Sequence, residues 1–311
     1  MKKTLLTAAV AAMAFMAVSP ASAQVLSTKE QIQFYTSAWK GERFADGRPK
    51  ISDDLVRRAQ VISLEEAWGT LRQAGYNNQF ESGWKTLHPG KAIVGRALTA
   101  QYMPLRPDMK DALSARAAQL KGWDDKSNIW PIQELQPGDI YVADSYGKVV
   151  DGTLIGDILG NSIYAKSKNG VVFDGSVRDV QGLSQIEGFN GIWRDADPSA
   201  IREMQMVQIN GPIRIGRASV LPGDLVVAKY DGVVFIPAHL ADLVVTQSEF
   251  IALRDAFGHQ AVRTGQFGPE HIDTAWSKEV KDAFLKWVDQ NPDRLPMSKA
   301  EFQEVLKRNK W

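Results

Sequence analysis

The alternation of apolar and polar residues divides the chain into a β-rich centre with helices toward both ends. Short apolar runs of the length of buried strands fill the centre, and turn-forming residue pairs separate several of them. The predicted strands are 92–100, 139–143, 170–174, 207–209, 213–215, 225–228 and 233–236. Segment 153–168, between the second and third strands, is predicted as a helix. Strand, helix and strand in this order predict one βαβ-like unit.

Capping patterns and apolar spacing predict the terminal helices. The capping boxes are Ser27-x-x-Glu30, Ser63-x-x-Glu66 and Ser298-x-x-Glu301. Two further helices are predicted at 240–257, stopped by Gly258, and at 278–288. Together the elements predict an α/β domain at 51–260, an N-terminal extension at 24–50 and a helical C-terminal extension at 261–311.

The first residues have the organisation of a secretory signal peptide. Lys2 and Lys3 precede an apolar run over 5–18, and Ala21-Ser22-Ala23 fits a cleavage site. The run is too short for a typical membrane span, although a membrane anchor or a buried helix is the alternative interpretation. We therefore expect residues 1–23 to direct export to the periplasm, with no stable membrane anchor after cleavage.

Composition narrows the possible chemistry. The chain has 311 residues, 44% of them apolar and 23% charged, and a formal net charge of +1, which is typical of a globular protein and does not favour nucleic-acid binding. It has no cysteine, which excludes disulfides, thiolate nucleophiles and cysteine-bound metals. No two of its four histidines are spaced i, i+4. A bound metal is therefore expected to be a hard ion held by carboxylates.

The glycine-flanked residue Asp157 is the first candidate for chemistry. Gly156 and Gly160 surround it where a loop is predicted to enter the helix. Free backbone amides at a helix start can hold an anion.

A second candidate follows the apolar strand 170–174. Asp174 and Gly175 are predicted to end this strand, and Arg178 and Asp179 lie in the next loop, where α/β folds commonly bind ligands. Arginine can hold a carboxylate through two hydrogen bonds, and aspartate can bind a divalent metal. A surface ion pair between the two side chains explains the same residues. Asp174 is expected to hydrogen-bond backbone near the site and not to bind metal.

The spacing of these candidates resembles a known motif. Asp157, twenty intervening residues and then Arg178-Asp179 are similar to the D-x20-R-D motif of the RraA-like family. That family includes 4-hydroxy-4-methyl-2-oxoglutarate / 4-carboxy-4-hydroxy-2-oxoadipate aldolases and regulators of ribonuclease E activity. Further matching segments lie at 95–99, 156–159, 172–179, 222–226 and 231–237. The resemblance extends over roughly residues 50 to 258.

The resemblance implies a layered α/β/β/α sandwich, similar to swivelling domains, and a class II lyase. By this resemblance Asp179 would bind Mg²⁺ or Mn²⁺, Arg178 would contact a 2-keto acid and Asp157 would order water. Substrate binding would also involve Gly156 and the amides of Ile158, Leu159 and Gly160. The implied reaction releases pyruvate from a 2-keto acid, or decarboxylates oxaloacetate. A homotrimer or homohexamer with the site near a subunit interface is also implied.

Three features depart from the family pattern. They are the signal peptide, the two extensions, and Gly160 at a position where alanine is usual. Export argues against ribonuclease regulation, because the target enzyme is not in the periplasm. The alternatives to the lyase are a non-catalytic periplasmic binding or regulatory protein on this scaffold and, more narrowly, an enzyme acting on a sugar-derived acid.

Overall fold

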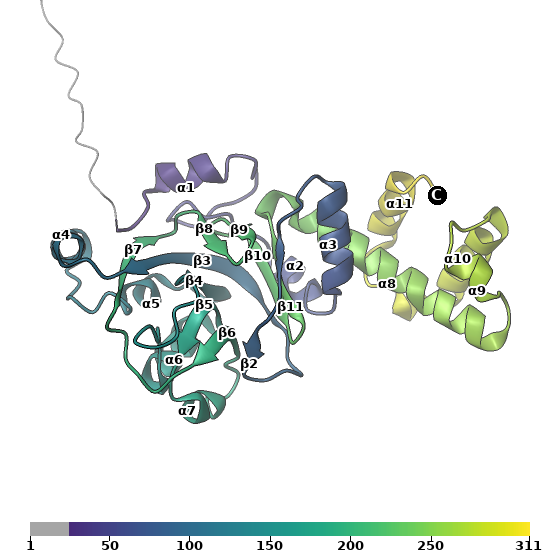
Figure 1. Ribbon diagram of the computed structural model, residues 1–311. Helices are drawn as coiled ribbons and strands as arrows, with labels where there is room; N and C mark the ends of the chain where they lie inside the picture. Colours follow the sequence, from purple (N-terminus) through teal and green to yellow (C-terminus); the bar gives the residue numbers. More distant parts are fainter. Residues whose placement is uncertain (1–24) are drawn as a thin grey trace, which may run out of the picture.

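The computed structural model describes residues 25–311. The predicted signal peptide at 1–23 lies outside the described residues. Figure 1 shows a curved central sheet with helices on both sides and a helical unit at the C-terminal end. Within residues 25–311 no helix combines the length and the apolar character needed to cross a bilayer.

The main sheet has nine strands in the order β1-β11-β10-β3-β4-β5-β6-β2, with β7 paired to β3. β3, β4, β5 and β6 run parallel, and the other strands join the sheet antiparallel. A separate hairpin is formed by β8 and β9. The strands are β1 (Phe80–Glu81), β2 (Lys85–Thr86), β3 (Ile93–Pro104), β4 (Asp139–Asp144), β5 (Val171–Val177), β6 (Gly191–Ala196), β7 (Met204–Ile209), β8 (Ile213–Ile215), β9 (Ala218–Val220), β10 (Leu225–Lys229) and β11 (Gly232–Ile236).

Three apolar layers hold these strands and helices together. The first lies between α4 to α7 and the parallel strands, the second between the parallel strands and β8 to β11, and the third between β10, β11 and helices α2, α3 and α8. The helices are α1 (Lys29–Tyr35), α2 (Asp53–Arg58), α3 (Leu64–Gln73), α4 (Pro107–Lys121), α5 (Trp130–Glu134), α6 (Asp157–Ser167), α7 (Val180–Ser184), α8 (Ala241–Thr264), α9 (Pro269–Ile272), α10 (Lys278–Gln290) and α11 (Lys299–Arg308). This order of layers confirms the predicted mixed α/β class.

Two predicted helix limits are wrong for identifiable reasons. The first helix is capped by Thr28 with Gln31, one residue later than predicted, because the amide of Ser27 donates to the carbonyl of Ile209 at 3.0 Å. Helix α8 continues through Gly258 and ends at Gly265, whose φ is +70°. A Cβ on Gly258 would lie 2.8 Å from Ile272 Cγ2, so this glycine makes room for α9.

Two limits near the predicted βαβ unit also differ. The predicted helix 153–168 begins only at Asp157, because Thr153 forms a β-bridge with Ser176 and Leu154 donates its amide to Ser176 O at 2.9 Å. Strand β5 continues past the predicted end to Val177, since a register shift after Phe173 lets Ser176 pair with β6.

The N-terminal strap, residues 25–50, is fixed to the domain by polar contacts. The buried guanidinium of Arg48 donates to Asp46 at 2.7 Å and to Asp139 at 2.9 Å. Val25 and Ser27 exchange backbone hydrogen bonds with Ile209. The strap is therefore tied to the beginning of β4 and the end of β7.

The C-terminal unit, formed by the second half of α8 with α9, α10 and α11, has a separate apolar core. Its buried aromatic side chains are centred on Phe284. The predicted boundary at residue 260 falls inside α8, which contributes residues to both the domain core and this second core.

Candidate functional site

The entrance to helix α6 lies beside the end of strand β5. Arg178 donates its amide to Ile155 O at 2.9 Å, and the preceding Leu154 bonds to Ser176. Gly156 is the extended N-cap of α6, and no side chain caps this helix. These backbone bonds place Asp157 next to the loop that holds Arg178 and Asp179.

Asp179 has an unusual backbone conformation and an unused carboxylate. Its φ of +54° lies in the left-handed region, which non-glycine residues seldom occupy and which is often found at functional sites. Asp179 is the N-cap residue of α7, yet its side chain makes no capping hydrogen bond. The nearest cation is Arg178, whose Nε lies 3.7 Å from Asp179 Oδ2, and the two side chains are 45% and 46% exposed. This open ion pair leaves both groups accessible to a ligand.

The three candidate side chains line one hollow of about 150 Å³. Asp157, Arg178 and Asp179 are its charged residues, and Gly156, Ile158 and Leu159 also line it. The structure therefore brings together the residues that the sequence predicted, with the exception of Gly160. Lining residues that sequence reasoning missed are Asn128, Thr153, Ala200 and Ile201. Asn128 and residues 200–201 are far from the motif in the sequence, and no spacing connects them to it, whereas Thr153 lies in the same segment as Asp157.

The backbone amides at the start of α6 differ from the prediction. The Gly160 amide donates to Gly156 O at 2.9 Å within the first turn, so it cannot hold a substrate. The Ile158 amide donates to Asp157 Oδ1 at 2.8 Å. The Leu159 amide has no hydrogen-bond partner in the described part of the chain. Of the three predicted amides, only that of Leu159 is free.

Two glycines allow the loops to approach this closely. A Cβ on Gly156 would collide with the Asp179 carboxylate. A Cβ on Gly182 would lie 2.8 Å from Asp157 Oδ2. Because glycine has no Cβ, these two positions leave room for the carboxylates of Asp157 and Asp179 at one edge of the sheet. Residues 25–311 contain no cluster of three or more histidine, aspartate or glutamate side chains placed to hold a metal.

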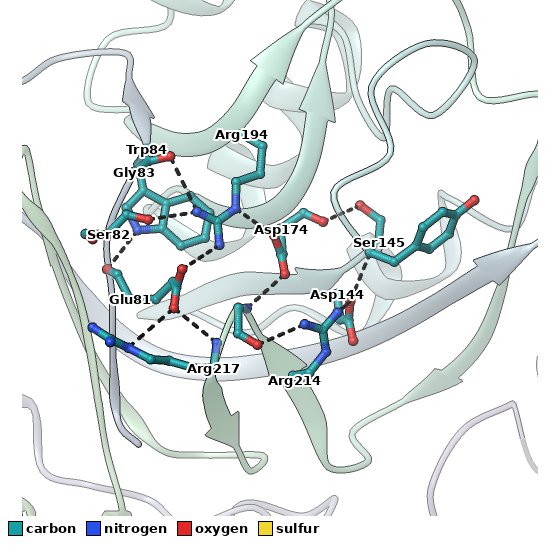
Figure 2. Close-up of polar contacts among 12 residues, drawn as sticks. Glu81, Ser82, Gly83, Trp84, Asp144, Ser145, Asp174, Arg194, Arg214 and Arg217 are labelled. Carbon is teal, nitrogen blue, oxygen red and sulfur yellow. Dashed lines mark hydrogen bonds and ion pairs between the residues drawn. The ribbon is translucent and has the colours of Figure 1, made fainter. Parts of the chain in front are cut away.

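Asp174 belongs to a different polar cluster, shown in Figure 2. Its carboxylate accepts hydrogen bonds from Arg194 Nε at 2.7 Å and from the Gly216 amide at 2.9 Å. Arg194 also pairs with Glu81 and lies 3.8 Å above the Trp84 ring. Asp174 therefore bonds backbone, as predicted, but at the β8–β9 hairpin and not at the Asp157 hollow.

The fold and this site define a layered α/β protein with an acidic and basic motif at the end of a parallel strand. The family model "RraA-like: Aldolase/RraA" matches residues 49–235. The chain belongs to the RraA-like family.

Relatives in this family support the assignment. A putative 4-hydroxy-4-methyl-2-oxoglutarate aldolase from Halalkalibacterium halodurans is 30% identical over 140 residues, or 45% of this chain. The match spans 66% of that relative's length. A second putative aldolase of this name, from Shewanella oneidensis, is 32% identical over 124 residues, covering 37% of this chain and 69% of the relative.

A solved structure gives the same family and fold. Streptomyces coelicolor RraAS2, described as an unusual member of the RNase ES inhibitor RraA protein family, aligns with a TM-score of 0.58 at 28% identity. The alignment covers 68% of this chain and 99% of RraAS2. Both extensions lie largely outside the residues that the family model matches.

Proposed function

We propose that the protein is a divalent-metal-dependent lyase that cleaves a 2-keto acid and releases pyruvate. The observation that carries this proposal is the shared hollow of Asp157, Arg178 and Asp179. The similarity to putative 4-hydroxy-4-methyl-2-oxoglutarate aldolases supports the same class of reaction. Oxaloacetate decarboxylation is the related reaction that we expect as a side activity, because it also forms pyruvate enolate.

The donor set fits Mg²⁺ or Mn²⁺. Mg²⁺ is commonly bound through one or two carboxylates, with waters and substrate completing its shell. Asp179 supplies an exposed carboxylate with no capping role, and the missing Cβ of Gly156 leaves space beside it. Asp179 would hold the ion, with Asp157 nearby to orient water. The ion would supply Lewis-acid stabilisation of the negative charge that develops on the keto oxygen.

The cationic and amide groups suit the substrate carboxylate. The exposed Arg178 guanidinium can form two parallel hydrogen bonds to a carboxylate. The free amide of Leu159 lies at the N-terminal end of α6, where the helix dipole also favours an anion. Arg178 and Leu159 would therefore orient the 2-keto acid.

The cleavage needs one proton to be removed and one to be returned. In a 4-hydroxy-2-keto acid the proton leaves the 4-hydroxyl, the C3–C4 bond breaks, and its electron pair forms the enolate of pyruvate. Asp157 would accept the hydroxyl proton through an ordered water, because its carboxylate borders the hollow. Return of a proton to C3 completes the pyruvate product.

The activity is tested by pyruvate release from the purified protein. The panel is oxaloacetate, 4-hydroxy-4-methyl-2-oxoglutarate, 4-carboxy-4-hydroxy-2-oxoadipate and several keto-deoxy sugar acids, each with Mg²⁺ or Mn²⁺. We expect metal-dependent turnover that EDTA abolishes and that Asp179→Asn lowers at least about a hundredfold. Asp111→Asn, an exposed change on α4, is the matched control and should keep full activity. Absence of both turnover and Mn²⁺ binding would favour the non-catalytic binding protein.

A second copy of the chain is proposed to complete the site. The hollow of about 150 Å³ is smaller than the roughly 300–1,000 Å³ of typical small-molecule sites, and Ile158 at its edge is 80% exposed. A homotrimer or homohexamer would cover this side chain. Light scattering of wild type and Ile158→Glu tests the assembly, and the charged variant should dissociate. A monomeric wild type would contradict it.

The protein is further proposed to be exported to the periplasm. The charged and apolar pattern of residues 1–23 supports this location. N-terminal sequencing of protein recovered from the periplasmic fraction should begin at Gln24. Recovery of an uncleaved chain from the cytoplasm would refute the proposal.

A further inference from the structure

A second hollow lies under the N-terminal strap, separate from the keto-acid site. Its volume is about 470 Å³, within the range of small-molecule sites. Strap residues 35–39 form one wall, and loop 76–79 after α3 forms another. It shares no lining residue with the Asp157 hollow. Because 35–39 precede the family match at 49–235, this hollow depends on the chain's own extension.

The lining combines aromatic faces with uncharged polar groups. Tyr35, Trp39 and Tyr76 contribute aromatic rings, and three neighbouring amides come from residues 77–79. No lysine or arginine of residues 25–311 lines the hollow. His239 also lines it, and burial lowers the pKa of this imidazole, which favours its neutral form. Its walls therefore offer hydrogen-bond donors and acceptors next to apolar ring surface.

Several of these polar groups have no partner of their own. The Asn77 and Asn78 side chains are exposed and make no hydrogen bond within the described chain. Gln79 is held in place, since its Nε2 donates to Phe235 O at 2.7 Å. Tyr76 Oη lies 3.1 Å from His239 Nε2, which fixes the phenol at the rim. The hollow thus has both rigid and unengaged hydrogen-bonding groups.

The base of the hollow is a buried carboxyl group. Asp224 is 3% exposed, and its Oδ2 accepts the Leu221 amide at 2.8 Å. No cation of residues 25–311 forms an ion pair with it. Burial raises the pKa of Asp224 to about 7, so the group can be neutral and donate a hydrogen bond.

The combination of aromatic rings, side-chain amides and a buried carboxyl group disfavours anionic and purely apolar ligands. An anion would find no lysine or arginine of residues 25–311 in the lining, and its charge would lie near Asp224. A purely apolar ligand would leave the amides and the carboxyl group without hydrogen bonds, which costs free energy. A sugar ring presents an apolar C–H face for stacking and several hydroxyl groups that both donate and accept. We propose that the hollow between the strap and loop 76–79 binds an uncharged sugar ring.

Calorimetric titration of the full-length purified protein tests this assignment. The probes are D-glucose, D-galactose, D-xylose, N-acetyl-D-glucosamine and cellobiose. We expect saturable binding of at least one of them. Absence of saturable binding by all five would overturn the proposal.

Paired variants locate the binding. Tyr35→Ala removes an aromatic wall, and we expect it to weaken binding roughly tenfold. The neighbouring Phe34→Ala is the control, because Phe34 is 74% exposed and does not line the hollow. Asn78→Ala should weaken binding as well, whereas the exposed Gln73→Ala should not. Equal effects of the two members of either pair would place the sugar elsewhere.

Two further comparisons separate this site from the keto-acid site and from charge recognition. Asp179→Asn should leave sugar affinity unchanged, because Asp179 lines only the other hollow. D-Glucuronate and D-glucosamine should bind more weakly than D-glucose. Loss of sugar binding in Asp179→Asn, or tighter binding of either charged sugar, would overturn the assignment of an uncharged ligand to the strap hollow.

Discussion

The two extensions are attached to the domain by different combinations of apolar and polar contacts. The N-terminal strap adds single apolar side chains such as Val25 to the domain core, and Arg48 ties it to Asp139, with both side chains of this ion pair fully buried. The C-terminal unit has a dense aromatic core around Phe284 and shares helix α8 with the domain. Its polar link is Arg58, which contacts Glu249 at 2.5 Å and Glu301 at 2.9 Å.

This difference in attachment determines how independently each extension can move from the domain. Directional hydrogen bonds fix the strap to the domain near its two ends, at Ser27 and at Arg48, so the segment between them can form the wall of a specific hollow. Apolar packing is non-directional, and a unit with its own core can fold around itself with few contacts elsewhere. We therefore expect the C-terminal unit to loosen independently and the strap to loosen only together with the domain.

The largest effect is expected from Phe284→Ala. This side chain is fully buried against Phe250, Phe257 and Trp287, and its removal should destabilise the C-terminal unit by about 4 kcal/mol. Hydrogen exchange should increase in α9 to α11 and remain slow in β3 to β6. The exposed Val262→Ala in α8 is the control. Faster exchange throughout the sheet would show that the two cores are one cooperative unit.

A slightly smaller effect is expected from Arg48→Met. The methionine retains apolar volume but leaves Asp139 as a buried charge without its partner, which should cost about 3 kcal/mol. Urea unfolding should show this loss for the whole domain. Arg57→Met, whose ion pair is exposed, should change stability by less than about 0.5 kcal/mol.

A double variant sharpens the interpretation of Arg48. Arg48→Met with Asp139→Asn removes the charge as well as its partner, so much of the lost stability should return. If the double variant is as unstable as the sum of the single variants, the pair does not act as a unit, and the strap is held by its other contacts.

Local signals in the sequence predicted elements well where no distant contact competes. Ser63 and Ser298 cap α3 and α11 as predicted. The prediction at Ser27 failed because its amide pairs with Ile209, far away in the sequence. Gly258 did not stop α8 because its position is set by packing on α9. Long-range contacts decided both cases, and spacing along the chain does not report them.

In the candidate site, too, the sequence predicted some features and long-range contacts decided the others. The motif spacing predicted that Asp157, Arg178 and Asp179 lie at one place, and the structure brings them into one hollow. The spacing did not predict that the Gly160 amide bonds within α6 or that Asn128 lines the hollow. Both features depend on the path of the backbone in three dimensions. The strap hollow was not predicted either, because its aromatic and amide residues come from segments without a common motif.

The buried carboxyl group that lines the hollow under the strap predicts a pH dependence that an aromatic core lacks. Burial raises the pKa of Asp224 from its ordinary value near 3.8 to about 7. Folding therefore takes up a proton between these values, so this group lowers stability as pH rises through that window. The Asp224→Asn variant has no carboxyl group to titrate at this position. Between about pH 5 and pH 7 the wild type should therefore lose about 2 kcal/mol of unfolding free energy relative to the variant.

Urea unfolding of both proteins at the two pH values measures this change. Asp111→Asn is the control, because its carboxylate is exposed and should give parallel curves. A constant difference between wild type and Asp224→Asn would show that the carboxyl group is ionised in the folded protein throughout this range. The strap would then cover a charged floor, which would also weaken the case for an uncharged ligand there.

The smallest effect is expected in the domain between the two ends, at Gly160. Alanine favours a helix by about 1 kcal/mol over glycine, but a Cβ here would lie 3.0 Å from Ile186 Cδ1 and still closer to Leu183 Cδ2. Overpacking costs about 1–3 kcal/mol, so Gly160→Ala should be destabilising by about 1 kcal/mol. Because α6 carries Asp157 and α7 follows Asp179, the same change should also lower any pyruvate-releasing activity.

The Leu183→Ala background separates helix propensity from packing. Removing the leucine side chain removes the main clash, so Gly160→Ala should become stabilising by about 1 kcal/mol in that background. Urea unfolding of the four proteins in this cycle measures the change of sign. An unchanged effect in both backgrounds would mean that α6 and α7 adjust freely, and that the glycine does not set the spacing between the carboxylates of Asp157 and Asp179.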